Sequence, residues 1–172
     1  VLPVGRACVS SQSSSDIMFI DDNFISDVLN KVPVVKYSHF KNAYSTNSKI
    51  AVAIADGSIR KRLFSELEKD GIPAWNIVAE NAVIMDEVSI GEGHIICSFV
   101  TLTSNIKIGI GFHANIYSYV AHDCVIGNFV TFAPAVKCNG NVIIENGVYV
   151  GTGAIIKQGT PDNPIVIGEN AI

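Results

Sequence analysis

Charged side chains are scarce in this sequence of 172 residues. They make up 16% of it, with 12 lysines and arginines against 16 aspartates and glutamates, and the formal net charge is −4. No block or stripe of basic residues is present to neutralise a phosphate backbone, which argues against a nucleic-acid partner. Small anionic ligands need only a few local donors and are not excluded. Hydrophobic residues make up 48%, ample material for a folded core.

Cysteines and long apolar runs are also few. The four cysteines lack the C-x-x-C spacing of a zinc site and the density of a secreted disulfide scaffold, so we predict reduced thiols in a cytoplasmic protein. No stretch approaches the ~20 apolar residues of a membrane span. No signal peptide is visible, and we expect no membrane insertion.

A sixfold period dominates the sequence from about residue 78 onward. Neither a helix, with a period near 3.6, nor an ordinary strand, with a period of 2, repeats in this way. A parallel β-helix, built from coils of very short strands, does. The apolar series is Val78, Ile84, Ile90, Ile96, Leu102, Ile108, Ala114, Val120, Ile126, Phe132, Cys138, Ile144, Val150 and Ile156.

The other positions of each hexad agree with coils that turn at corners. Glycine and asparagine recur there, as in "IGEGHI", "IGNFVT" and "IENGVY", and supply the backbone angles that turns need. The period breaks once, after "IKQGTP", and resumes at Ile167 five residues late, which predicts a loop at one corner. Since repeat arrays usually end in an atypical cap, we expect the natural protein to continue past Ile172.

The first part of the chain reads as alternating strands and a helix. Apolar runs at 16–23, 32–35 and 49–57 predict strands, and 58–71 predicts a helix. Such alternation indicates a small parallel sheet of the nucleotide-binding, Rossmann-like kind. We therefore expect a nucleotide-binding domain over 1–77 and a β-helix domain over 78–172.

The predicted helix has start and stop signals. Ser58 can cap its beginning, Ile59, Leu63 and Leu67 give it an apolar stripe, and Gly71 can end it. The chain opens with "VLPVGRACVSS", which reads as a helix that would follow a glycine-rich, phosphate-binding turn. The strand and turn before that helix are therefore expected to be missing.

Acidic side chains follow two of the predicted strands. Asp21 and Asp22 follow the first, and Ala55 and Asp56 end the later one. In open α/β sheets ligands bind beyond the carboxyl ends of strands. These positions predict contacts with a ribose or a nucleobase, although each acid alone is as readily a solvated loop residue.

One segment, "YVAHDCVIGN", places His122 beside Asp123 in an apolar, glycine-punctuated run. The pair is either a solvated turn or a general base with a carboxylate that supports it. The residues alone do not decide between the two.

A Rossmann-like front followed by hexads containing "HDCVIGNFV" resembles a known family. It is similar to the bacterial nucleotide-amino-sugar N-acetyltransferases and the related sialic-acid O-acetyltransferases. The resemblance implies a left-handed β-helix, a homotrimer with active sites between subunits, acetyl-CoA as donor and a nucleotide-linked amino sugar as acceptor. It also implies that His122 is the catalytic base and that Asp123 raises its basicity.

The resemblance implies further roles for residues of the repeat. Gly140, one coil of eighteen residues after His122, matches a glycine whose N–H faces the thioester carbonyl. Asn115 matches a polar residue of the acceptor pocket, and Gly151 with Thr152 matches part of the coenzyme A groove. Thr131 stands where some relatives carry a second histidine near the acetyl group. Asp21 and Asp22 match acids that contact the nucleotide.

Alternatives to this interpretation are a metal site, a cysteine nucleophile and a protein without catalysis. β-Helix carbonic anhydrases bind zinc through three histidines, but the spacing of His94, His113 and His122 does not bring three imidazoles to one level, so we expect no metal. His39, His94 and His113 are interpreted as structural, and Cys124 and Cys138 as packing residues. A sugar O-acetyltransferase and a non-catalytic scaffold remain the alternative functions.

Overall fold

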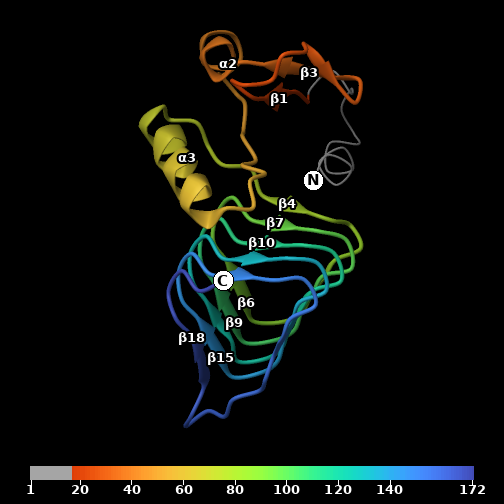
Figure 1. The fold of residues 1–172 in the computed structure, drawn as a ribbon, viewed down its shortest axis with the longest axis vertical. Helices are drawn as coiled ribbons and strands as arrows, with labels where there is room; N and C mark the ends of the chain where they lie inside the picture. Colours follow the sequence, from red (N-terminus) through yellow and green to blue (C-terminus); the bar gives the residue numbers. More distant parts are fainter. Residues whose placement is uncertain (1–16) are drawn as a thin grey trace.

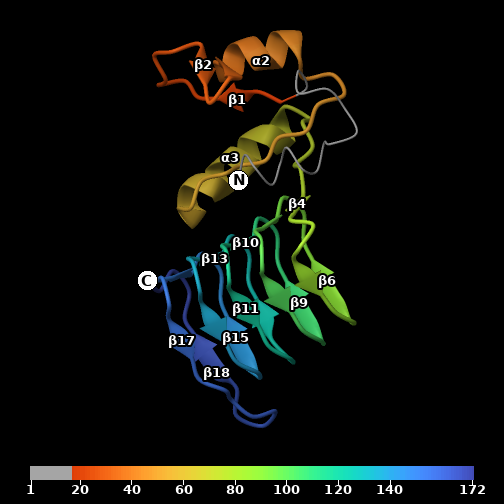
Figure 2. The same ribbon diagram turned by 90° about the vertical axis from the view of Figure 1, so that its right-hand side faces the viewer.

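The computed structural model describes residues 17–172. Most of it is a three-sided stack of parallel coils; a longer helix lies against the upper coils, and a small unit of strands and one helix sits beyond it (Figures 1 and 2). The helix predicted for "VLPVGRACVSS" lies outside the described residues.

The stack confirms the parallel β-helix, with one five-stranded parallel sheet on each face. Face 1 contains β4 (Ile77–Val78), β7 (Ile95–Ile96), β10 (His113–Ala114), β13 (Thr131–Phe132) and β16 (Tyr149–Val150). Face 2 contains β5 (Val83–Ile84), β8 (Thr101–Leu102), β11 (Tyr119–Val120), β14 (Lys137–Cys138) and β17 (Ile155–Ile156). Face 3 contains β6 (Val88–Ile90), β9 (Ile106–Ile108), β12 (Val125–Ile126), β15 (Val142–Ile144) and β18 (Ile165–Ile167).

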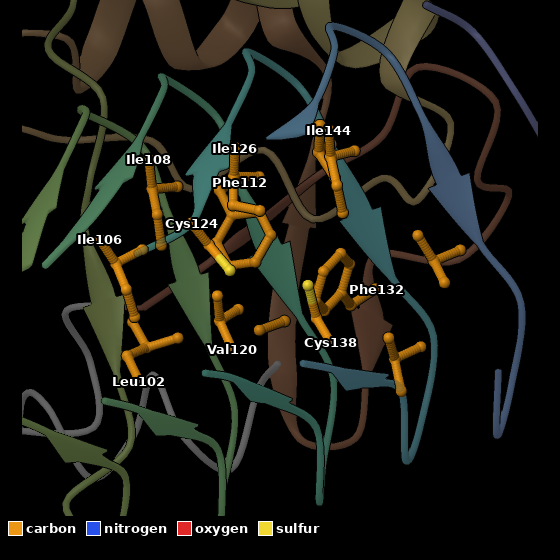
Figure 3. Close-up of a cluster of buried hydrophobic side chains, with 14 of the residues drawn as sticks. Leu102, Ile106, Ile108, Phe112, Val120, Cys124, Ile126, Phe132, Cys138 and Ile144 are labelled. Carbon is orange, nitrogen blue, oxygen red and sulfur yellow. The ribbon is translucent and has the colours of Figure 1, made fainter. Parts of the chain in front are cut away.

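The predicted apolar series forms the interior of this stack. Ile96, Leu102, Val120 and Phe132 are each at most 1% exposed, and each lies in register with a residue eighteen positions away. Figure 3 shows these side chains filling the space between the faces. A fully buried aliphatic side chain contributes roughly 1.5–3 kcal/mol, so the ladder is the main source of stability. Burial is weaker in the first coil, where Ile84 is 40% exposed.

The corners are built from left-handed backbone at every sixth residue. This conformation favours glycine, asparagine and aspartate, because other side chains crowd the backbone there. The positions with positive φ are Glu87, Gly93, Phe99, Asn105, Gly111, Tyr117, Asp123, Phe129, Ala135, Asn141, Gly147 and Gly153. The hexad is therefore one inward residue plus one left-handed corner residue. Some of the recurrent glycines occupy these left-handed positions. Others, such as Gly91 and Gly127, leave room for the backbone of the next coil, which a Cβ would approach to within 2.8 Å.

The break in the period is a loop at one corner, as predicted. β15 and β18 pair with an offset of 23 residues, whereas the other pairs of the stack are offset by 18. The extra five residues leave the stack around Thr160 and Asn163, which pair with each other, and the loop projects at the lower end of Figure 1. Ile167 then re-enters the interior row.

The front of the chain differs from the predicted parallel sheet. β1 (Phe19–Ile20) and β3 (Val32–Val35) pair in parallel, but β2 (Val28–Leu29) joins β3 antiparallel, and α2 (Tyr37–Ala43) follows. The strand predicted over 49–57 is wrong. Apart from one bridge between Ile50 and Ala74 it has no partner strand among residues 17–172, and its later carbonyls accept bonds from side chains instead. A Rossmann-like unit is not confirmed.

The predicted helix is confirmed as α3 (Gly57–Lys69), with two corrections. Its N-cap is Asp56, whose carboxylate accepts the N–H groups of Ser58 and Ile59, so Ser58 is not the cap. Ile59 is 39% exposed and does not belong to the packed face. Gly71 ends the helix in the left-handed conformation, as predicted.

Arg60 fastens α3 to the coils. It is 0% exposed, and its guanidinium donates to the carbonyl oxygens of Gly111 at 2.7 Å, Phe129 at 2.8 Å and Ile54 at 2.6 Å. Burial lowers the pKa of Arg60 to about 10, so it is charged at neutral pH. An arginine in this position was not predicted, because arginine is almost never fully buried without a charged partner.

Two structural findings concern the described range alone. Between residues 17 and 172, no helix has the length and apolar character needed to cross a bilayer. The same range contains no cluster of three or more histidine, cysteine, aspartate or glutamate side chains arranged to hold a metal ion.

Candidate active site

His122 and Asp123 lie at the corner between faces 2 and 3, after β11 and before β12. Neighbouring side chains of a strand point to opposite faces, but the left-handed backbone at Asp123, with φ of 59°, brings the two to the same side. His122 Nδ1 is 2.7 Å from Asp123 Oδ2, and each side chain is 47% exposed. The structure therefore forms the predicted pair on an accessible corner.

The protonation of this pair follows from its bonds. Hydrogen bonds from His122 and then from Asn105 lower the pKa of Asp123, so its carboxylate is an anion that can only accept. His122 Nδ1 must therefore carry the hydrogen, which leaves the lone pair on Nε2. Nε2 has no hydrogen-bond partner among residues 17–172. This arrangement suits a proton acceptor.

Gly140 lies against the imidazole one coil further along the stack. A Cβ added there would be 2.7 Å from Cε1 and 2.8 Å from Nε2 of His122. Any other residue would displace the ring. Within the described chain no acceptor bonds the Gly140 N–H, while its carbonyl accepts from Gly159. This N–H is therefore available to a ligand.

The cysteines beside this corner point inward. Cys124 and Cys138 are both 0% exposed and lie in the interior (Figure 3). The hydrogen bond with Cys124 and burial both raise the pKa of Cys138. These thiols are packing residues, as the hexad position predicts. The three cysteines of the described range are free.

Ala55, Asp56 and Thr131 come together on face 1, away from His122. The Thr131 hydroxyl donates to the Ala55 carbonyl at 2.7 Å and accepts from Arg60 at 2.9 Å. It is 6% exposed. Asp56 Oδ1 is bonded within the cap of α3. In this structure these polar groups join α3 to the coils.

Asn115, Gly151 and Thr152 lie at the corner between faces 1 and 2. Asn115 and Gly151 occupy equivalent positions two coils apart, and Asn115 is exposed. A Cβ at Gly151 would meet nothing within 4 Å, so the surface there is open. Within one chain these residues occupy a different edge of the stack from His122.

Asp21 and Asp22 follow β1 at the edge of the front unit. Asp22 Oδ1 accepts the N–H of Tyr37 at 2.8 Å and so holds the start of α2. Asp22 lines an open cavity of about 470 Å³ with Lys36 and Lys41, and Asp21 lines a second of about 490 Å³. The acids thus flank open space at a strand end, as predicted.

Comparison with known proteins supports the resemblance. No protein-family model matches the chain. GDP-perosamine N-acetyltransferase from Escherichia coli O157:H7 is 43% identical over 169 residues, which are 97% of this chain and 76% of that protein. The solved structure of WeeI from Acinetobacter baumannii AYE has a TM-score of 0.96 at 51% identity, covering 98% of this chain and 80% of that one.

A more distant structure shares the fold. Perosamine N-acetyltransferase from Caulobacter crescentus, a mutant in complex with CoA and GDP-perosamine, has a TM-score of 0.71 at 20% identity. It covers 87% of this chain and 78% of that one. This likeness is consistent with the predicted left-handed winding.

The stack of hexapeptide coils and the similarity to the Escherichia coli N-acetyltransferase together identify an acyltransferase of the hexapeptide-repeat class. Within that class, the chain belongs to the bacterial nucleotide-amino-sugar N-acetyltransferase family. The resemblance inferred from "HDCVIGNFV" is confirmed.

Proposed function

We propose that the protein transfers the acetyl group of acetyl-CoA to the amino group of a nucleotide-linked 4-amino sugar. The observation that carries the proposal is the His122–Asp123 pair, with Nδ1 held at 2.7 Å and Nε2 unbonded within residues 17–172. The name of the Escherichia coli relative supports a GDP-linked sugar as the acceptor.

The chemistry needs no covalent enzyme intermediate. The neutral sugar amine attacks the thioester carbonyl carbon, and His122 Nε2 accepts a proton from the attacking nitrogen. The Asp123 carboxylate stabilises the imidazolium that forms. Collapse of the tetrahedral intermediate breaks the C–S bond, and the imidazolium returns the proton to the departing CoA thiolate.

Gly140 supplies the group that stabilises the intermediate. Its N–H has no acceptor among the described residues, and the residue itself lies against the imidazole. A backbone donor aimed at a developing oxyanion is worth about 10²-fold or more in rate. Thr131, Gly151 and Thr152 are proposed to line the coenzyme site, and Asn115 the acceptor pocket.

The active enzyme is proposed to be a homotrimer with sites between subunits. Two features support this. Large apolar side chains are exposed on the outer faces, among them Val125, Ile155 and Val166. The proposed base and two of the proposed coenzyme residues, Gly151 and Thr152, occupy different corners of one chain, so a neighbouring chain is needed to bring them together. Activity should then disappear on dilution to monomer, before circular dichroism changes.

The front unit is proposed to bind the nucleotide. Asp21, Asp22, Ala55 and Asp56 offer acceptors, and carboxylates pair with ribose hydroxyls or a nucleobase N–H and repel phosphate. The open cavities beside Asp21 and Asp22 support this placement. The enzyme is proposed to act in the cytoplasm.

The test is transfer from acetyl-CoA to a panel of nucleotide 4-amino sugars, read by mass. His122→Ala should lower kcat by about 10²-fold or more, the usual contribution of a general base. Glu68→Ala, which removes an exposed side chain near the end of α3, is the control and should retain full activity. Unchanged turnover in His122→Ala would remove His122 from the mechanism.

The product distinguishes the alternative functions. An amide survives neutral hydroxylamine, whereas an acetate ester is cleaved, so loss of the added mass would indicate an O-acetyltransferase. Absence of transfer to every sugar would indicate a scaffold without catalysis.

A further inference from the structure

Asn105 contacts the proposed catalytic pair, although the proposed mechanism gives it no role. Its side-chain amide Nδ2 donates to Asp123 Oδ1 at 3.1 Å, while the other oxygen of that carboxylate bonds His122 at 2.7 Å. The three side chains form one chain of hydrogen bonds that ends at the unbonded Nε2. Asn105 and Asp123 are eighteen residues apart, which is one coil.

The backbone conformation at the two corners brings these two side chains into contact. Asn105 and Asp123 occupy the same left-handed corner position in successive coils, both with φ of 59°. Their side chains therefore leave the corner in the same direction, one above the other. Asparagine tolerates this conformation better than most residues, so the donor is presented without displacing the coil.

Two other asparagines of the stack behave differently. Asn128 Oδ1 accepts the N–H of Ile110, and Asn146 Oδ1 accepts the N–H of Asn128. Each of those amide oxygens accepts a hydrogen bond from a backbone N–H of the preceding coil, and so stabilises the corner itself. The bond of Asn105 instead joins side chain to side chain, and its partner is the carboxylate that holds His122.

We propose that Asn105 is a positioning residue that fixes the orientation of the Asp123 carboxylate and, through it, the tautomer of His122. An anchored carboxylate presents one oxygen to Nδ1–H, so that Nε2 keeps the lone pair. Without the anchor the carboxylate rotates more freely, and the imidazole samples the tautomer with hydrogen on Nε2. The inference rests on the proposed role of His122 as the base.

The first test replaces Asn105 with alanine. We expect kcat to fall about tenfold, within the range of coupling between contacting residues, with KM for both substrates changed less than about twofold. In ¹⁵N-detected NMR at neutral pH, the fraction of His122 with hydrogen on Nε2 should rise. The NMR signal does not need turnover, so it tests Asn105 even if the proposed acceptor is wrong.

The second test exchanges the amide and the carboxylate. In Asp123→Asn, the new amide can turn its NH₂ group toward Nδ1 and impose the wrong tautomer. In Asn105→Asp, a second carboxylate faces Asp123 and repels it. In the double variant Asn105→Asp with Asp123→Asn, the carboxylate at 105 accepts the amide NH₂ and directs the amide oxygen to His122. The double variant should therefore be more active than either single variant.

Glu87→Ala provides a matched control. Glu87 holds the same left-handed corner position one coil earlier and should leave kcat and the His122 tautomer unchanged. Melting temperatures identify any variant that fails to fold, and isosteric Asn105→Asp provides a second variant. An unchanged tautomer in Asn105→Ala, or a double variant no better than the singles, would overturn the proposal. If His122→Ala is fully active, the proposed role of His122 as the base fails, and the NMR result still decides whether Asn105 sets the tautomer.

Discussion

At the scale of single residues, the site depends on which amino acids occupy the corner positions of successive coils. His122 and Asp123 could be predicted from their motif, and the spacing of one coil led to Gly140. The same spacing applied backward from Asp123 reaches Asn105, which the sequence analysis did not consider. Thr131 could not be placed in the same way, because its hydroxyl bonds Ala55 and Arg60 from a segment whose course the hexad does not specify.

Gly140→Ala tests the contact beneath the imidazole. The new Cβ would lie within 3.0 Å of three ring atoms, so the ring must shift from its position beside Gly140. We expect kcat to fall by about tenfold or more, since small displacements of a base are costly, while the melting temperature changes little. Gly168→Ala, where a Cβ would meet nothing within 4 Å, is the control. Full activity of Gly140→Ala would show that the ring tolerates displacement.

At the scale of elements, the period of six predicted the coils almost strand by strand, because each hexad places one apolar side chain in the interior of the stack. It predicted the front unit less well. Apolar content marked 49–57 as a strand, but pairing needs a neighbouring strand, and among the described residues only Ile50 finds a bridge. The stripe assigned to α3 missed its most buried residue, Arg60, because hydrophobic spacing cannot identify a charged side chain that binds carbonyl oxygens.

Arg60→Met should loosen α3. Methionine fills similar space but leaves the carbonyls of Gly111 and Phe129 without their donor, and each unsatisfied buried group costs about 1–3 kcal/mol. Hydrogen exchange of α3 amides should accelerate, and chemical denaturation should show a loss of about 3 kcal/mol. Arg62→Met, on an exposed side of the same helix, removes only a loose pair with Glu66 at 3.9 Å and should cost little. Equal effects of the two changes would contradict the anchoring role.

At the scale of the whole molecule, acid sensitivity is expected from one buried histidine. Burial, and then the charge of Arg60, lower the pKa of His113 to about 3 from its ordinary value of 6.5. The folded protein keeps His113 neutral, while the unfolded chain binds a proton below about pH 6.5. Stability from this group is fully present above that pH and is lost progressively toward pH 3, by at most about 1.4 kcal/mol per unit.

His113→Val should flatten this dependence. Valine suits the outer row between Ile95 and Thr131 and removes an Nε2 atom that is buried without a partner. Melting temperatures measured between about pH 6.5 and 4.5 should fall less steeply than in the unmodified protein, whatever the starting stability. His39→Ala leaves the buried histidine in place and should retain the original slope. The same slope in His113→Val would assign the sensitivity to other groups.

The way in which Arg60 attaches α3 to the coils affects which sequence changes the protein can accept during evolution. Arg60 contacts carbonyl oxygens of the coils, and every amino acid carries a carbonyl. Substitutions at Gly111 or Phe129 that preserve the backbone therefore keep the acceptors, although both positions have left-handed backbone. An insertion or deletion in those coils moves the acceptors and breaks the attachment. This joint should tolerate substitutions over long divergence yet reject changes of length, so that gaps between relatives should fall outside these coils.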